Sequence, residues 1–122
     1  MKHFAPTFIP IVLLLLCFAL PAWAESETGV EAYKRGDYAT ALKEFRKLAD
    51  QGDALGQLNL GLLYAYGQGV PQDYVQAHMW LNLSAAQGNE KALKAREVLA
   101  MRMTHAQIAE AQQLARNWKP KK

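Results

Sequence analysis

The sequence contains an internal repeat, and this repeat restricts the possible folds more than any single motif does. When the chain is shifted by 36 residues, the segment DYATALKEFRKLADQGD at 37–53 aligns with DYVQAHMWLNLSAAQGN at 73–89. Seven aligned pairs are identical or closely related: Asp37 and Asp73, Tyr38 and Tyr74, Ala41 and Ala77, Ala49 and Ala85, Gln51 and Gln87, Gly52 and Gly88, Asp53 and Asn89. A period of about 20–50 residues is typical of proteins built from stacked, similar units.

Both copies of the repeat have the residue spacing of amphipathic helices. Apolar residues recur every three or four positions, as in Ala41, Phe45 and Leu48 of the first copy. A glycine follows most of the expected helices, at the position where a left-handed residue often ends a helix. An aspartate or asparagine precedes the next helix, where its side chain can accept a hydrogen bond from a free backbone N–H. The pattern predicts an all-α fold of α/α hairpins, about three helix pairs, with helices at 26–35, 38–50, 54–66, 74–86, 90–103 and 105–118.

The connection YAYGQGVPQDY at 64–74 is longer than the other links, with five residues inserted between Gly67 and Asp73. Glycine-rich loops bind phosphates in many enzymes, but a dinucleotide fingerprint requires a third glycine where this chain has Gln72. The lysine and hydroxyl residue of a P-loop are also missing. Gly67 and Gly69 are therefore expected to adopt positive φ angles in a turn between helices, and no cofactor is predicted.

Residues that could form a catalytic or metal site are few and scattered. His78 and His105 lie 27 positions apart, and neither belongs to an HxxxH or ExxH pair. Ser84 has no neighbouring base in the sequence to activate its hydroxyl. We expect no catalytic residue and no metal site, and we interpret His78 as a residue on a helix surface that replaces an aromatic one.

The N-terminal segment 1–24 has the pattern of a secretory signal peptide. Residues 4–24 are almost wholly apolar, and Ala22 and Ala24 occupy the small-residue positions before a signal peptidase site. An uncleaved membrane anchor is the alternative, although three prolines interrupt the apolar stretch. We expect cleavage after Ala24 and an exported protein, periplasmic or secreted, with one small domain and no cysteine in the remaining residues.

Basic charge is concentrated at the C-terminal end. Residues 25–90 carry 5 basic and 9 acidic side chains, whereas residues 91–122 carry 8 basic and 2 acidic ones. The final NWKPKK has the composition for weak contact with anionic lipid or polysaccharide. A solvated tail over 119–122 is the simpler interpretation, and the expected export argues against nucleic acid as a partner.

Residues 29–118 resemble a known protein family. Residues 56–89 are similar to one complete Sel-one-like repeat, a relative of the tetratricopeptide repeats. Residues 29–56 resemble a truncated copy, and residues 90–118 resemble the helix pair that closes short bacterial members. Together they suggest one repeat domain over 25–118. The family pattern is found in Leu60, Gly61, Tyr64, Gly67, Gly69, Val70, Asp73, Ala77, Trp80, Ala85 and Gly88.

The resemblance implies a non-catalytic scaffold that binds another envelope or secreted protein, since bacterial members are often exported adaptors. The alternative is a surface module that docks on anionic lipid or polysaccharide through its basic C-terminal end. Gly56 stands where the family usually has alanine, and this departure is expected to loosen the start of its helix. By family position, the concave partner-binding groove is expected to contain Glu31, Lys34, Arg35, Leu62, Ala65 and Tyr66.

Overall fold

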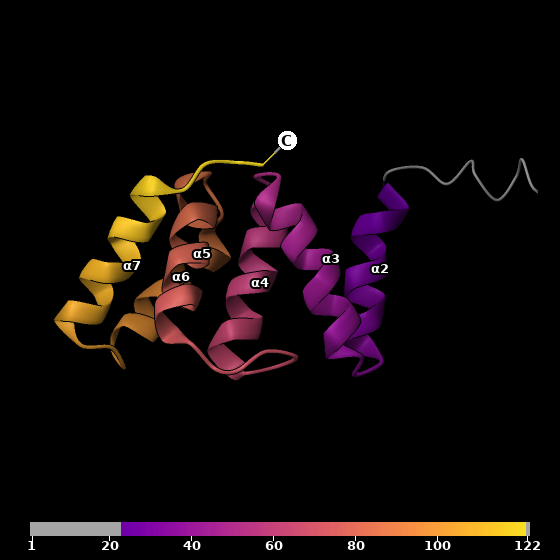
Figure 1. The fold of residues 1–122 in the computed structure, drawn as a ribbon, viewed down its shortest axis with the longest axis horizontal. Coiled ribbons are helices and arrows are strands. Elements are labelled where there is room, and N and C mark those ends of the chain that lie inside the picture. The colour runs from indigo at the N-terminus through magenta and orange to yellow at the C-terminus, as the bar shows by residue number, and fades with distance from the viewer. Residues whose placement is uncertain (1–22, 122) are drawn as a thin grey trace, which may run out of the picture.

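The chain folds into a row of helices that follow one another side by side (Figure 1). The structure, a computed structural model, describes residues 23–121, so the predicted signal peptide lies outside it except for its last two residues. Within residues 23–121 there are six helices and no strand, which confirms the all-α prediction. The helices are α2 (Trp23–Lys34), α3 (Tyr38–Asp50), α4 (Ala54–Tyr66), α5 (Tyr74–Ala86), α6 (Glu90–Ala100) and α7 (His105–Asn117).

Local capping explains where these helices begin. The side chains of Asp37, Asp53, Asp73 and Asn89 each accept a hydrogen bond from the backbone N–H three residues later. The Thr104 side chain does the same at the start of α7. The side-chain oxygen of Gln107 in turn accepts a hydrogen bond from the Thr104 backbone N–H, and the two bonds complete a capping box. The predicted Asp and Asn caps are confirmed, and the helix starts agree with those expected from the sequence, apart from α2.

Small residues allow the paired helices to approach one another closely. A Cβ atom added to Gly61 of α4 would lie 2.9 Å from Cγ of Leu81 and 3.2 Å from the carbonyl oxygen of Ala77, both on α5. Gly56 serves the contact between α3 and α4, since a Cβ there would lie 2.6 Å from Cβ of Leu48. The expectation that Gly56 loosens the start of its helix stays a prediction, and the structure adds that the missing side chain makes room for Leu48.

One apolar core runs through all three helix pairs. Its most deeply buried large members are Leu60, Leu63 and Leu81, from α4 and α5. The smaller residues Ala32, Ala41, Ala92 and Ala115 bring the remaining helices α2, α3, α6 and α7 into the same cluster. Because each helix pair buries apolar side chains against the neighbouring pair, each pair depends on its neighbours for stability.

The long corner between α4 and α5 packs against the first helix pair. Gly67 and Gly69 have φ angles of 66° and 73°, which confirms the predicted turn geometry. A Cβ atom on Gly69 would lie only 2.5 Å from the carbonyl oxygen of Tyr38, at the start of α3. The hydroxyl of Tyr33 donates a hydrogen bond to Oε1 of Gln68 (3.0 Å), so side chains also join the corner to α2.

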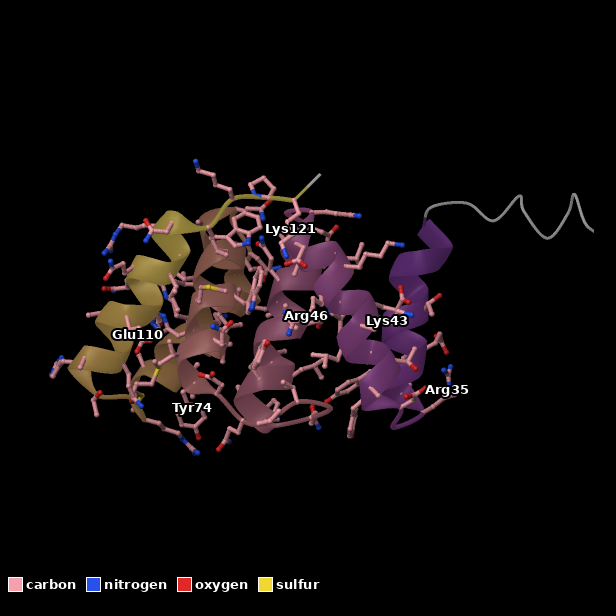
Figure 2. All side chains as sticks on the ribbon, in the orientation of Figure 1. Arg35, Lys43, Arg46, Tyr74, Glu110 and Lys121 are labelled. Carbon is pink, nitrogen blue, oxygen red and sulfur yellow. The ribbon has the colours of Figure 1, made fainter. Side chains whose placement is uncertain are left out.

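The C-terminal residues 118–121 form a strap that crosses the opposite edge of the row (Figure 1). Trp118 packs edge-on against Trp80 of α5, with ring centroids 6.0 Å apart. The backbone N–H of Lys121 donates to the carbonyl oxygen of Asp50 (2.7 Å), and its ammonium lies 3.7 Å from the Asp50 carboxylate. Figure 2 shows Lys121 over one end of the helices, with Tyr74 at the other. Lys119, Pro120 and Lys121 are exposed, as expected of a solvated tail, but the bonds of Lys121 attach this tail to the α3–α4 corner.

The contact of Gly69 with Tyr38 can be separated from backbone strain by a pair of substitutions. Gly36 also has a positive φ angle (79°), but a Cβ atom there would meet nothing within 4 Å. We expect Gly36→Ala to lower the free energy of unfolding by about 1–2 kcal/mol through strain alone. Gly69→Ala should lose about 1–3 kcal/mol more, because its Cβ meets backbone. Urea denaturation measures both losses, and equal losses would show that the corner moves away from Tyr38 freely.

The strap is expected to contribute to global stability. Trp118→Ala should lower the free energy of unfolding by about 1–3 kcal/mol, less than for a fully buried tryptophan because Trp118 is half-buried. Lys119→Ala, at the exposed neighbouring position, is the matched control and should change stability by less than about 0.5 kcal/mol. Chemical denaturation of both variants is the measurement. Equal stability of the two variants would contradict a structural role for the strap.

Candidate functional site

One stripe of α4 stays exposed on the face that the first helices of the three pairs share. Leu55, Asn59, Leu62 and Tyr66 recur at intervals of four, three and four residues, so their side chains lie along one side of the helix. Leu55 and Tyr66, at the two ends of the stripe, are 62% and 67% exposed. Asn59 and Leu62 between them are half-buried, and Leu62 also packs against the core.

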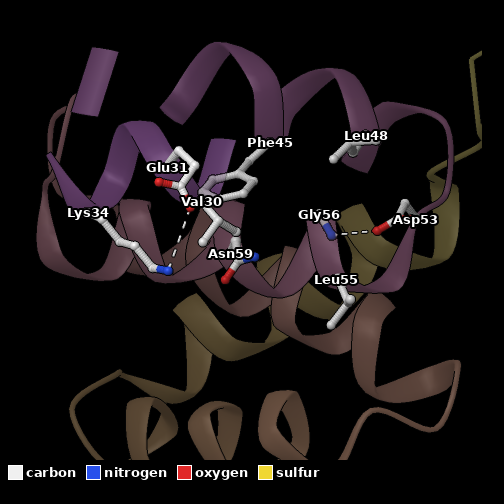
Figure 3. A pocket seen from close by; sticks show the side chains of 9 residues that line it. All are labelled: Val30, Glu31, Lys34, Phe45, Leu48, Asp53, Leu55, Gly56 and Asn59. Carbon is white, nitrogen blue, oxygen red and sulfur yellow. Dashed lines mark hydrogen bonds and ion pairs between the residues drawn. The ribbon is translucent and has the colours of Figure 1, made fainter. Parts of the chain in front are cut away.

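A first hollow of about 440 Å³ opens between α2 and α4 (Figure 3). Phe45 and Leu48 of α3 form its apolar base, and Gly56 of α4 packs closely against Leu48. Its other lining residues are Val30, Glu31, Lys34, Asp53, Leu55 and Asn59. The Lys34 ammonium lies 3.7 Å from the Glu31 carboxylate, and Asp53 is held at the start of α4 by its bond from the Gly56 N–H (2.7 Å).

A second hollow of about 420 Å³ opens on the other side of α4, toward α6. Leu62, Ala65 and Tyr66 of α4 line one wall, and Tyr74 and Leu81 of α5 lie at its base. The other wall is α6, which supplies Lys94, Ala95, Val98 and Leu99, and Arg102 from the turn that follows α6 extends it. Gln72 completes the lining, and its side-chain amide donates to the carbonyl oxygen of Ala65 (2.9 Å), which fixes the corner beside the hollow.

The predicted groove residues are divided between the two hollows. Glu31 and Lys34 line the first, whereas Leu62, Ala65 and Tyr66 line the second. Arg35 lines neither, and its guanidinium instead lies 4.0 Å from the Asp37 carboxylate. The pKa of Asp37 is lowered, chiefly by hydrogen bonding to Thr40. Whether these positions bind a partner stays a prediction.

Sequence reasoning missed the contribution of α6. The residues Lys94, Ala95, Val98, Leu99 and Arg102 were assigned to the closing helix pair, and the two cations also to the basic C-terminal end, yet all five line the second hollow. Their spacing of one, three, one and three residues is the signal that was available, because it places all five on one side of a helix. Arg96, by contrast, faces α5, where its Nη1 donates to Oδ1 of Asn82 (2.5 Å).

Two of the residues considered for catalysis, Ser84 and His78, are buried in the fold. Ser84 is fully buried and donates to the carbonyl oxygen of Ala54 (2.7 Å), which joins α5 to α4. His78 is only 4% exposed, so its assignment to a helix surface was wrong. Burial lowers the pKa of His78, and the charge of Arg96 lowers it further. Among the described residues, no group of three or more His, Cys, Asp or Glu side chains is arranged to hold a metal ion.

Gln57 marks a buried polar link at the strap edge of the molecule. Gln57 is fully buried in α4, and its side-chain oxygen accepts a hydrogen bond from the Gln87 side chain (2.9 Å). Gln87 also donates to the carbonyl oxygen of Gly52 (2.8 Å), over which Trp118 and Pro120 lie. The Gln57–Gln87 bond joins the end of α5 to α4, and the Gln87–Gly52 bond joins it to the corner between α3 and α4. Within residues 23–121, the helices are too short or too polar to cross a lipid bilayer.

Comparison with known proteins assigns the repeats. Residues 24–53 and 54–89 each match the family model for the Sel1 repeat. The chain is 43% identical over 49 residues to DAP3-binding cell death enhancer 1 of Rattus norvegicus, and equally to that of Mus musculus. It is 32% identical over 84 residues to an F-box protein of Arabidopsis thaliana. These matches cover 40% of this chain and 10% of each mammalian protein, and 69% of this chain and 22% of the plant protein.

The buried position of His78 predicts that stability depends on pH. Because the folded pKa lies below the unfolded value of about 6.5, the unfolded chain takes up a proton first as the pH falls. The free energy of unfolding should therefore fall between pH 7 and pH 5, by at most about 1.4 kcal/mol per pH unit. Above about pH 6.5 this contribution should be fully present.

Urea denaturation at several pH values would measure this slope. His78→Gln should reduce the slope whatever its effect on stability at pH 7.5, because glutamine does not titrate. His105→Gln, at the exposed start of α7, is the matched control and should leave the slope as it is in the wild type. An unchanged slope in the His78 variant would show that other groups carry the dependence.

Proposed function

Because the chain belongs to the Sel1 repeat family, we propose that it is a non-catalytic scaffold that binds another protein through the face formed by α2, α4 and α6. Sel1 repeats generally mediate protein–protein interaction, and proteins that contain them are typically non-catalytic adaptors. The name of the rat and mouse relatives states that they bind DAP3, so binding of another protein is a recorded property of relatives. The specific face and partner are proposals for this chain.

The observation that carries the proposal is the exposed apolar stripe between two hollows. Val30 of α2, Leu55 and Tyr66 of α4 and Val98 of α6 are all exposed, and each lines one of the hollows. A partner that covers these side chains would remove apolar surface from water, at about 25 cal/mol per Å². Tyrosine at such a position is also typical of the residues that dominate binding energies at interfaces.

The shape and lining of the two hollows suit a peptide segment of a partner better than the substrate of an enzyme. Each is open along a helix and mixes apolar side chains with a few charges. Segments of a partner that are extended or helical bind such surfaces with side chains placed in successive hollows. The residues with catalytic potential are used elsewhere, Ser84 for the α4–α5 contact and His78 for the interior.

We propose further that the protein acts after export, in the periplasm or outside the cell, as the apolar segment 1–24 and its Ala22 and Ala24 positions suggest. The partner is then another envelope or secreted protein. Docking on anionic lipid or polysaccharide through the C-terminal end has less support. Lys121 is engaged with Asp50 through its backbone and its side chain, and this holds the strap against the protein.

Quantitative affinity capture from an extract of the producing cells would test the proposed face. We expect the triple variant Leu55→Ser, Tyr66→Ser and Val98→Ser to lose partners that the wild type captures, with affinity reduced by tenfold or more. Because these side chains are largely exposed, the variant should keep its helices and its melting temperature to within a few degrees.

The matched control changes three exposed apolar residues that line neither hollow. Leu93→Ser, Met101→Ser and Leu114→Ser remove side chains of similar size and should leave capture unchanged. Retention of the same partners by the first variant would refute the proposed face. Equal loss in both variants would indicate general apolar adhesion instead of a specific site.

A further inference from the structure

The two hollows of the proposed binding face differ in charge. Glu31, Asp53 and Lys34 are the charged residues that line the first hollow, so acidic groups predominate there. Lys94 and Arg102 are the charged residues that line the second, and no acidic side chain is among its lining residues. A partner that binds across α4 therefore meets a negative environment on one side and a positive one on the other.

The positive charges of the second hollow are not neutralised within the protein. Among the residues whose side chains the structure describes, neither Lys94 nor Arg102 forms an ion pair with an acidic side chain. Lys34 of the first hollow, in contrast, lies 3.7 Å from Glu31. The attraction of Lys94 and Arg102 for carboxylates is thus available to a ligand, and it weakens as salt is added.

The arrangement of the cations around the apolar lining restricts the ligand further. Lys94, Val98 and Arg102 follow one another in a row at intervals of four residues, the first two on α6 and Arg102 in the turn after its last residue, Ala100. Val98, in the middle of this row, is 62% exposed and adjoins the hollow lined by Leu62 and Tyr66. An apolar group that packs on Val98 consequently lies in a hollow that Lys94 and Arg102 also line.

We propose that the second hollow binds an acidic segment of the partner protein, in which one large apolar side chain is flanked by Asp or Glu on both sides. The apolar side chain enters between Leu62, Tyr66 and Val98, and the flanking carboxylates approach Lys94 and Arg102. The acidic lining of the first hollow repels such a segment and directs it to the second. This inference rests on the proposed function, and it specifies which kind of partner sequence the face selects.

Selection from a library of random 12-residue peptides, displayed on phage and presented to the protein expressed from its full sequence, would test the inference. We expect enriched peptides to contain an aromatic or branched aliphatic residue with Asp or Glu within three positions on both sides. Their affinity for the variant Lys94→Gln with Arg102→Gln should be about tenfold lower than for the wild type, as expected for two partly exposed charge pairs.

A variant with the same change of net charge serves as the control. Lys43→Gln with Lys119→Gln alters two exposed lysines that line neither hollow and should change the affinity by less than about twofold. Equal weakening in both double variants would overturn the inference, because it would show attraction to the overall charge.

The two hypotheses fail in different ways. Peptides that lose binding in the Leu55, Tyr66 and Val98 triple variant but show no preference for acidic residues would overturn the acidic-segment inference and leave the proposed face intact. Enriched peptides whose binding is the same in that triple variant and in the wild type would overturn both.

Discussion

The close approach of α4 to α5 is the contact on which the rest of the structure depends. At Gly61 the backbone of α4 has no Cβ atom, and the space is filled by Leu81 and by the Ala77 carbonyl of α5. Because interiors are packed about as densely as organic crystals, a single added methyl group here has no free volume to enter. This contact sets the separation of the central pair, against which the outer pairs α2–α3 and α6–α7 pack.

The two edges of the helix row are fixed by different means. At one edge the long corner places Gly69 against the backbone of Tyr38, so the connection between α4 and α5 also supports the first pair. At the other edge the strap holds Trp118 against Trp80 and binds Asp50 through Lys121. The guanidinium of Arg46 adds a bond to the Tyr64 hydroxyl between α3 and α4. A short repeat array has a small apolar core, and these contacts between segments that are distant in the sequence add to its stability.

This construction explains why the face of α2, α4 and α6 stays open. The second helices α3 and α5 lie against both neighbouring first helices, whereas the first helices hardly touch one another and leave a hollow on each side of α4. The hollows follow from the stacking of the helix pairs, and their charged lining residues Glu31, Lys94 and Arg102 are exposed and lie outside the core. Charge can therefore differ between the hollows, as it does between Glu31 and Asp53 in one and Lys94 and Arg102 in the other.

The sequence by itself determined the helices, their caps and the turn glycines, because these depend on residues within four positions of each other, as at Asp53 and Gly56 or Thr104 and Gln107. The 36-residue repeat further determined that the helices form stacked pairs. Only the tertiary structure decided the burial of His78, the packing role of Gly56, the course of the strap and the α6 wall of the second hollow. Each of these depends on which distant residue lies opposite, such as Leu48 beside Gly56 or Asp50 beside Lys121. Local spacing carries no information about such neighbours, since the same amphipathic pattern suits a helix in contact with any apolar surface.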